Sequence, residues 1–122
     1  SSNFGTGINI LAMILEDYSK ILADWELEIV ETHHNQKKDA PSGTALMLME
    51  ATGRTCPAHS LRLGNVPGDH AVCFGDGDEL LSFSHRIVNR SLLSRGALRA
   101  AEFAQSARPG YYNYQDVLRA SS

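Results

Sequence analysis

The chain has 122 residues, 43% of them hydrophobic and 20% charged, with a formal net charge of −3. This length suits one domain with a hydrophobic core of its own, and the mildly acidic balance argues against a nucleic-acid-binding or membrane-surface protein. No apolar run approaches the roughly 18 residues of a membrane span, and no basic segment followed by an apolar stretch predicts a secretory signal.

The first half of the chain predicts a helix, a strand and a second helix. Apolar residues at three- and four-residue steps predict a helix over residues 7–23. Alternating apolar residues and glutamates then predict a strand over 25–33, followed by a polar loop over 34–41. Ser42 is a favourable N-cap, and it predicts a helix that ends near residues 52–53.

The next part predicts an irregular segment and a hairpin. Residues 53–69 are rich in glycine and proline, with a short strand at 60–62. Two strands follow, over 70–75 and 78–88, because the Gly-Asp-Gly-Asp sequence between them is a strong short-loop hairpin signal.

The C-terminal part predicts a helix over residues 92–105 and an aromatic tail over 111–118 with one helical turn. One face of that helix gathers small residues for close packing: Ala97, Ala100, Ala101 and Ala104. The order of the elements predicts an α+β fold, a two-layer α/β arrangement in which a mixed sheet of about four strands packs against helices.

The spacing of the glycines and cysteines argues against two further classes of protein, those with a complete dinucleotide-binding domain and those held together by disulfides. The glycine pairs at residues 5 and 7 and at 75 and 77 lack the third glycine of a GxGxxG fingerprint. We therefore expect no complete dinucleotide-binding domain in this chain. Cys56 and Cys73 form neither a CxxC pair nor a disulfide framework, which predicts a reduced, cytoplasmic chain.

The densest polar cluster spans residues 33–44, between the end of a strand and the start of a helix. Open α/β sheets usually bind ligands at such a position. The helix N-terminus predicts an anion cradle for a carboxylate or phosphate, because Gly43 allows close backbone approach and Ser42 and Thr44 add hydroxyls. The alternative interpretation is an ordinary capped helix.

Two imidazoles and an ammonium group, from His33, His34 and Lys37, lie close to that cradle in the sequence. Histidine exchanges protons near neutral pH, so the group predicts acid–base chemistry; the alternative is a solvated basic loop. Neighbouring residues of a strand point to opposite faces, so the two histidines are not expected to bind one metal ion.

Single histidines and cysteines outside this polar cluster are weaker candidates for functional residues. His85 is expected to be a core or interface histidine on an apolar strand face, and His59 a surface loop residue. His70 is either the start of a strand or part of a site. Cys73 alternates with apolar residues in a strand and is predicted to lie in the core.

The polar cluster closely resembles the signature of the 4-hydroxy-tetrahydrodipicolinate reductases, or dihydrodipicolinate reductases, of bacterial and plant lysine biosynthesis. Residues 31–37 and 39–45 carry this resemblance, through Glu-Thr-His-His, the following lysine and Asp-Ala-Pro-Ser-Gly-Thr-Ala. Asn35 and Gln36 depart from it, since many members carry a basic residue there. Further segments resemble the family over residues 1–9, 62–70, 89–97 and 114–118.

The resemblance implies that residues 1–122 are the C-terminal substrate-binding and oligomerisation domain of such a reductase, with an interdomain junction at 1–6. The N-terminal Rossmann domain, which holds NADH or NADPH in the family, is then expected to be absent from this chain. The sheet is implied to join subunits into a homotetramer. The alternative is that the isolated chain is a catalytically inactive dicarboxylate-binding and oligomerisation module.

The resemblance also implies roles for single residues. His33 would be the catalytic acid–base residue and Lys37 its partner as proton donor. The dicarboxylate substrate would be bound by His34, Lys37, Ser42, Gly43 and Thr44. The nicotinamide end of the cofactor would be touched by Ser1, Ser2, Asn3 and Phe4. No metal, nucleic-acid or membrane partner is expected.

Overall fold

A computed structural model of the chain describes residues 5–107, 110 and 113–120. The elements, in chain order, are α1 (Thr6–Tyr18), the 3-10 helix η1 (Ser19–Leu22), β1 (Glu26–His33), α2 (Gly43–Thr52), β2 (Ala58–Arg62), β3 (Asp69–Gly75), β4 (Leu80–Arg86), α3 (Ser91–Ser106) and α4 (Tyr114–Ala120). The predicted order of helices and strands is confirmed.

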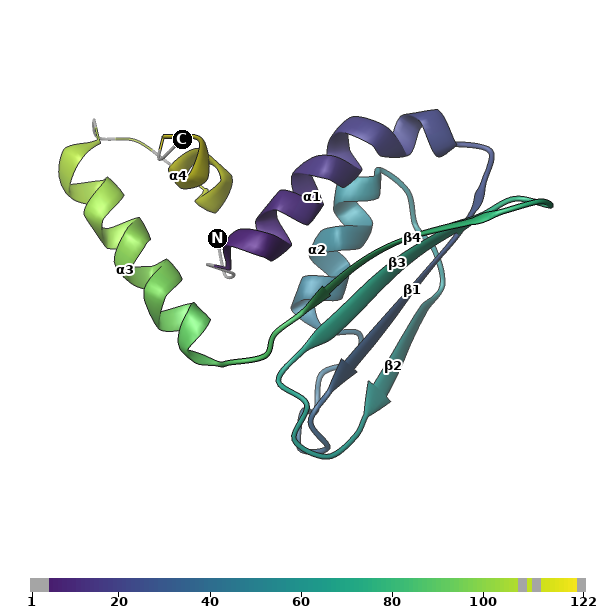
Figure 1. Cartoon of the computed structure of the whole chain (residues 1–122), viewed down its shortest axis with the longest axis horizontal. Coiled ribbons are helices and arrows are strands. Elements are labelled where there is room, and N and C mark those ends of the chain that lie inside the picture. The colour runs from purple at the N-terminus through teal and green to yellow at the C-terminus, as the bar shows by residue number, and fades with distance from the viewer. Residues whose placement is uncertain (1–4, 108–109, 111–112, 121–122) are drawn as a thin grey trace.

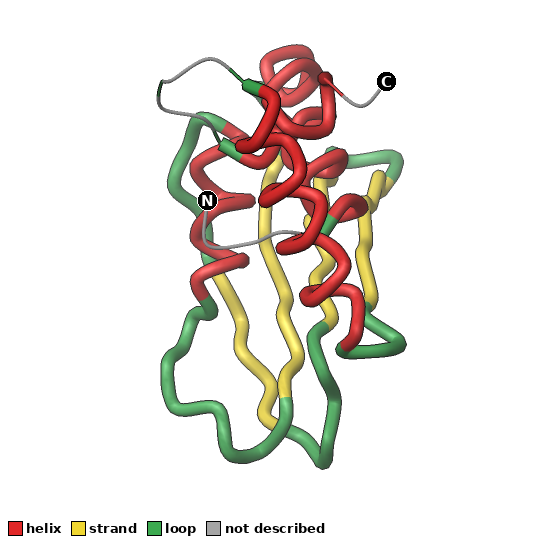
Figure 2. Tube along the Cα trace, turned by 90° about the vertical axis from the view of Figure 1, so that its left-hand side faces the viewer, coloured by secondary structure: helices red, strands yellow, loops and turns green. Residues whose placement is uncertain are grey.

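The strands form one four-stranded sheet in the order β2-β1-β3-β4. β1 pairs parallel with β2, whereas the β1–β3 and β3–β4 pairs are antiparallel. The sheet is mixed because α2 carries the chain from β1 across to the parallel β2, while a tight turn joins β3 to β4. Helices α1 and α2 cover one face of the sheet (Figure 1), and Figure 2 shows the strands behind that helical layer. The predicted α+β fold class is confirmed.

The core lies between this helical layer and the sheet. Its buried residues include Leu15 of α1, Leu48 of α2, Ile29 of β1 and Phe74 of β3. The buried face of β1 continues from Leu27 and Ile29 to Glu31 and His33, so its last two inward positions are ionisable. The candidate site therefore begins where the apolar core ends.

Helix α2 begins and ends as its sequence predicts. The Ser42 hydroxyl accepts a hydrogen bond from the Ala45 N–H at 3.1 Å, which is an N-cap contact. Gly53 ends the helix with φ at 78°, a left-handed conformation that glycine adopts without steric cost. No helix within the described ranges is long and apolar enough to cross a membrane.

Four sequence predictions need correction. The strand predicted over 78–88 is shorter, because the Asp76 carboxylate accepts hydrogen bonds from the Asp78 and Glu79 N–H groups, at 2.8 and 2.9 Å, and forms the turn there. Cys73 is not a core residue, since it points away from the face on which its neighbours are buried. His59 lies in β2 rather than in a loop, although it is exposed.

The fourth correction concerns α3. Its alanine face does not pack closely: Ala97, Ala101 and Ala104 are exposed, and Ala100 is half-buried. In Figure 1, α3 extends away from the sheet and runs back towards α4 rather than lying flat on the body. Helical periodicity correctly predicted the helix, but a small-residue face does not specify which element it contacts.

Candidate active site

Strand register brings the site together at one end of the sheet. Glu31 of β1 lies opposite Ser60 of β2 on one side and opposite His70 of β3 on the other. One step further along the same face, His33 lies opposite Arg62 of β2. The loop over residues 34–41 leaves β1 at this point and leads into α2.

The Glu31 carboxylate is fully buried and accepts hydrogen bonds from four residues. Arg62 binds both oxygens, at 2.7 Å from Nη1 and 3.0 Å from Nη2. The Ser60 hydroxyl donates at 2.9 Å, the Ser42 N–H at 2.8 Å, and His33 Nδ1 lies at 2.6 Å. Burial by itself would raise the pKa of Glu31, but these donors outweigh it and lower the pKa to about 2.

His70 and Ser42 form a second buried contact beside this carboxylate. The Ser42 hydroxyl lies 3.0 Å from His70 Nε2, and it already accepts the N–H of Ala45. In this contact either the Ser42 hydroxyl or an N–H at Nε2 of a neutral His70 imidazole can donate, because the hydroxyl oxygen can accept two hydrogen bonds. Burial, and next the charge of His33, lower the pKa of His70 to about 4. The two rings meet edge to face, 5.1 Å between centroids.

Lys37 lies in the loop that follows β1, and its backbone carbonyl accepts a hydrogen bond from Arg62 Nε at 3.1 Å. Its ammonium contacts the Asp39 carboxylate at 3.0 Å, and its side chain is 24% exposed. This hydrogen bond holds the pKa of Asp39 below its usual value. A ligand carboxylate that binds Lys37 would replace Asp39 as its partner, at little cost because Asp39 is exposed to water.

The predicted anion cradle is the N-terminus of α2. Gly43 and Thr44 are its first residues, where backbone N–H groups and the helix dipole favour an anion. Gly43 is exposed, and a Cβ added there would meet no side chain or backbone of a distant residue within 4 Å. The Ser42 hydroxyl, in contrast, is buried and bonded inside the protein, so this residue acts on the cradle as its cap.

Five predicted site residues remain, His34 and the four predicted cofactor residues. His34 follows β1 and accepts the Gln36 N–H at 3.2 Å through Nδ1. The predicted cofactor residues Ser1, Ser2, Asn3 and Phe4 lie outside the described residues. Across the described parts of the chain, no group of three or more histidine, cysteine or acidic side chains could hold a metal ion.

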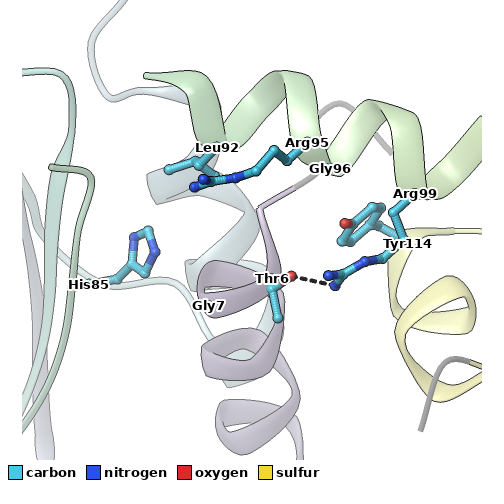
Figure 3. A pocket seen from close by; sticks show the side chains of 8 residues that line it. All are labelled: Thr6, Gly7, His85, Leu92, Arg95, Gly96, Arg99 and Tyr114. Carbon is cyan, nitrogen blue, oxygen red and sulfur yellow. Dashed lines mark hydrogen bonds between the residues drawn. The ribbon is translucent and has the colours of Figure 1, made fainter. Parts of the chain in front are cut away.

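A cavity of about 340 Å³ lies where α1 begins, between that helix, β4, α3 and α4. Figure 3 shows His85, Arg95 and Arg99 around the first turn of α1, and Arg99 donates to the Thr6 hydroxyl at 2.8 Å. Gly7 is needed at this turn, because an added Cβ would lie 2.9 Å from the His85 ring. His85 is half-buried here, in agreement with a histidine packed against a neighbouring element.

Sequence reasoning missed the central role of Glu31 and Arg62. The signal for Glu31 was present, since it occupies the inward position two residues after Ile29 in a strand with period two. For Arg62 no local signal exists, because its carboxylate partner is 31 residues away in the chain.

Residues 7–118 match the family model described as dihydrodipicolinate reductase, C-terminus. Two curated 4-hydroxy-tetrahydrodipicolinate reductases are similar to the chain. That of Thermosipho africanus is 47% identical over 119 residues, which cover 98% of this chain and 55% of the relative. That of Methanosarcina barkeri is 38% identical over 137 residues, covering 97% and 52%.

A solved structure is also similar, a dipicolinate-bound dihydrodipicolinate reductase from Paenisporosarcina sp. TG-14. It superposes with a TM-score of 0.72 at 22% identity, covering 95% of this chain and 52% of that chain. The likeness supports the fold. The chain spans about half the length of the curated relatives it matches.

Proposed function

The chain belongs to the dihydrodipicolinate reductase family, as its C-terminal domain, and from this we propose that it supplies the substrate site of an NAD(P)H-dependent reductase. The proposed reaction converts 4-hydroxy-tetrahydrodipicolinate to tetrahydrodipicolinate in the lysine and diaminopimelate pathway. The 4-hydroxyl group leaves as water, and the resulting conjugated imine takes up a hydride and a proton. The reduced nicotinamide supplies the hydride. The described residues include no glycine-rich strand–turn–helix unit to hold a dinucleotide, so we assign that task to the other half of the protein and to residues 1–4.

The observation that carries this proposal is that one buried ion pair contacts the His33 ring, the backbone carbonyl of Lys37 and the N–H at the start of α2. A substrate with two carboxylates suits an ammonium group and a helix N-terminus. Reduction of a conjugated imine leaves negative charge, which a proton from the imidazole or the ammonium group neutralises. His34 and Thr44 complete the proposed dicarboxylate contacts.

Replacing Lys37 by alanine is expected to weaken the binding of pyridine-2,6-dicarboxylate to this chain by about 10- to 100-fold. The physical reason is the loss of a hydrogen bond between two charged groups, about 1.5–3 kcal/mol. Isothermal titration calorimetry under metal-free conditions measures it. Lys38→Ala is the matched control, since Lys38 is the exposed neighbour with the same charge. Equal binding by both variants would contradict the role of Lys37.

The isolated chain is expected to have negligible reductase activity. Without a domain that holds the cofactor, the proximity contribution of roughly 7–11 kcal/mol to lowering the barrier is lost. Measurement of NAD(P)H oxidation with the family substrate tests this expectation. Substantial turnover by the 122-residue chain alone would overturn it.

We also propose that the sheet joins subunits, as a homotetramer. The face opposite α1 and α2 carries half-buried Val30 and Cys73, and Leu80 is 82% exposed beside them. These three residues line a shallow cavity of about 270 Å³ on that face. An exposed apolar patch of this kind can mark a contact with a partner, and the charged side chains of Glu26 and Glu28 line the same cavity.

A charge on that face is expected to break the assembly. Val30→Glu should reduce the mass measured by light scattering to that of a monomer, because a carboxylate would be desolvated in the interface. Leu98→Glu on the exposed side of α3 is the control. A wild-type chain that is monomeric at micromolar concentration would count against the proposal.

A further inference from the structure

We propose that Glu31 and Arg62 are positioning residues for the proposed reductase reaction. Glu31 fixes the imidazole of His33, and Arg62 fixes the loop that carries Lys37. The inference rests on the proposed function, and it assigns to one buried ion pair the placement of both proton-donating groups. Neither residue needs to touch the substrate.

Glu31 determines the tautomer of His33. Glu31 is ionised, so its carboxylate only accepts hydrogen bonds, and the hydrogen of the 2.6 Å contact must lie on His33 Nδ1. Nε2 is then the nitrogen that exchanges a proton with the substrate. Nε2 faces Gly68, where an added Cβ would lie 3.3 Å from it. Glycine at this position therefore leaves room beside the reacting atom.

The same carboxylate also fixes the start of α2. Its second oxygen accepts the Ser42 N–H at 2.8 Å, directly before the turn formed by Gly43 and Thr44. His33 and the anion cradle are thus held by the two oxygens of one side chain. A shift of Glu31 would move the proton donor and the carboxylate-binding backbone together.

Arg62 orders the loop from the other side. While two of its nitrogens bind Glu31, its Nε donates to the Lys37 carbonyl at 3.1 Å and Nη2 donates to the Asp39 carbonyl at 2.6 Å. These contacts need several donors in one plane, which a guanidinium offers and an ammonium does not. The backbone of Lys37 is therefore held relative to Glu31, and through Glu31 relative to His33.

The first test concerns Glu31. In the full-length reductase, Glu31→Gln is expected to lower kcat at least 10-fold per folded molecule. The tautomer of His33 is measured by ¹⁵N NMR of the labelled chain at about pH 8, where an unperturbed imidazole is neutral. Wild-type His33 should show mainly the Nδ1–H tautomer. In Glu31→Gln this tautomer should no longer be the main one. Glu28→Gln is the matched control, because it makes the same substitution on the exposed face of the same strand, where Glu28 pairs with the exposed His59.

The second test concerns Arg62 and does not depend on the folding of the first variant. Arg62→Lys is expected to raise KM for the substrate at least 5-fold, because it loosens the loop that carries Lys37. Its kcat should fall less than that of Glu31→Gln, because His33 stays bound to Glu31. A merely structural role would lower the folded fraction and leave KM unchanged.

Three results would overturn the inference: an Nε2–H tautomer in wild-type His33, wild-type kcat and tautomer in Glu31→Gln, or wild-type KM in Arg62→Lys. Failure of the proposed function is distinguishable from all three. It would show as a full-length wild-type protein that does not reduce the substrate, while the tautomer measurement on the chain would still report on the Glu31–His33 contact.

Discussion

Replacing His33 by glutamine in the full-length reductase is expected to lower kcat by about 10²- to 10⁴-fold, the usual contribution of a positioned general acid or base. Glutamine retains a polar side chain of similar reach, but it has no group that gains and loses a proton near neutral pH. Steady-state oxidation of NAD(P)H with the family substrate measures this effect. The KM for the substrate should change much less than kcat, because the anion cradle and Lys37 remain.

His59→Gln is the control for this substitution. His59 lies on the neighbouring strand β2, is exposed and pairs with the exposed Glu28. The control removes a histidine and an ion pair of little energetic value, so its kcat should match that of the wild type. A His33→Gln enzyme with nearly wild-type kcat would exclude His33 as the proton donor. A loss of equal size in both variants would point to a general effect of losing a histidine.

Acidification is expected to destabilise the domain in two steps. The folded-state pKa of His70 is about 4 against an ordinary value of 6.5, so the unfolded chain binds more protons between these values. The contribution of His70 to the free energy of unfolding is fully present above about pH 6.5. It is lost as the pH falls to about 4, which lowers the free energy of unfolding by about 3 kcal/mol. Glu31 has a folded-state pKa of about 2 against an ordinary value of 4.5. The free energy of unfolding therefore falls by about a further 3 kcal/mol as the pH drops from 4.5 to about 2.

Urea denaturation at a series of pH values between 7 and 2 tests both steps. In His70→Asn, the slope of stability against pH between about 6.5 and 4 should flatten, whatever the absolute stability of the variant. His59→Asn is the matched control, because this histidine is exposed and its replacement should leave the slope unchanged. A wild-type stability that stays constant from pH 7 to pH 4 would contradict the buried, neutral state of His70.

Local features of the sequence determined most of the elements. The Ser42 N-cap and the alternation in residues 25–33 are short-range signals, and the structure has both where they were predicted. The Gly-Asp-Gly-Asp sequence does form the turn of a hairpin, but the second strand begins only at Leu80. The resemblance over residues 31–45 identified the family, which the comparisons confirm. The roles of His33 and Lys37 remain predictions, although the structure places both beside the same buried ion pair.

What the sequence alone did not determine depends on contacts between distant strands. The predicted burial of Cys73 failed because side-chain alternation does not reveal which face of a strand the helices cover. The pairing of Glu31 with Arg62 follows from the register of the parallel strands β1 and β2, which the intervening helix α2 sets. A buried carboxylate is stable only if donors surround it, and here those donors come from β1, β2 and the residue before α2. Sequence therefore determined which groups are present, whereas tertiary structure decided that they share one site.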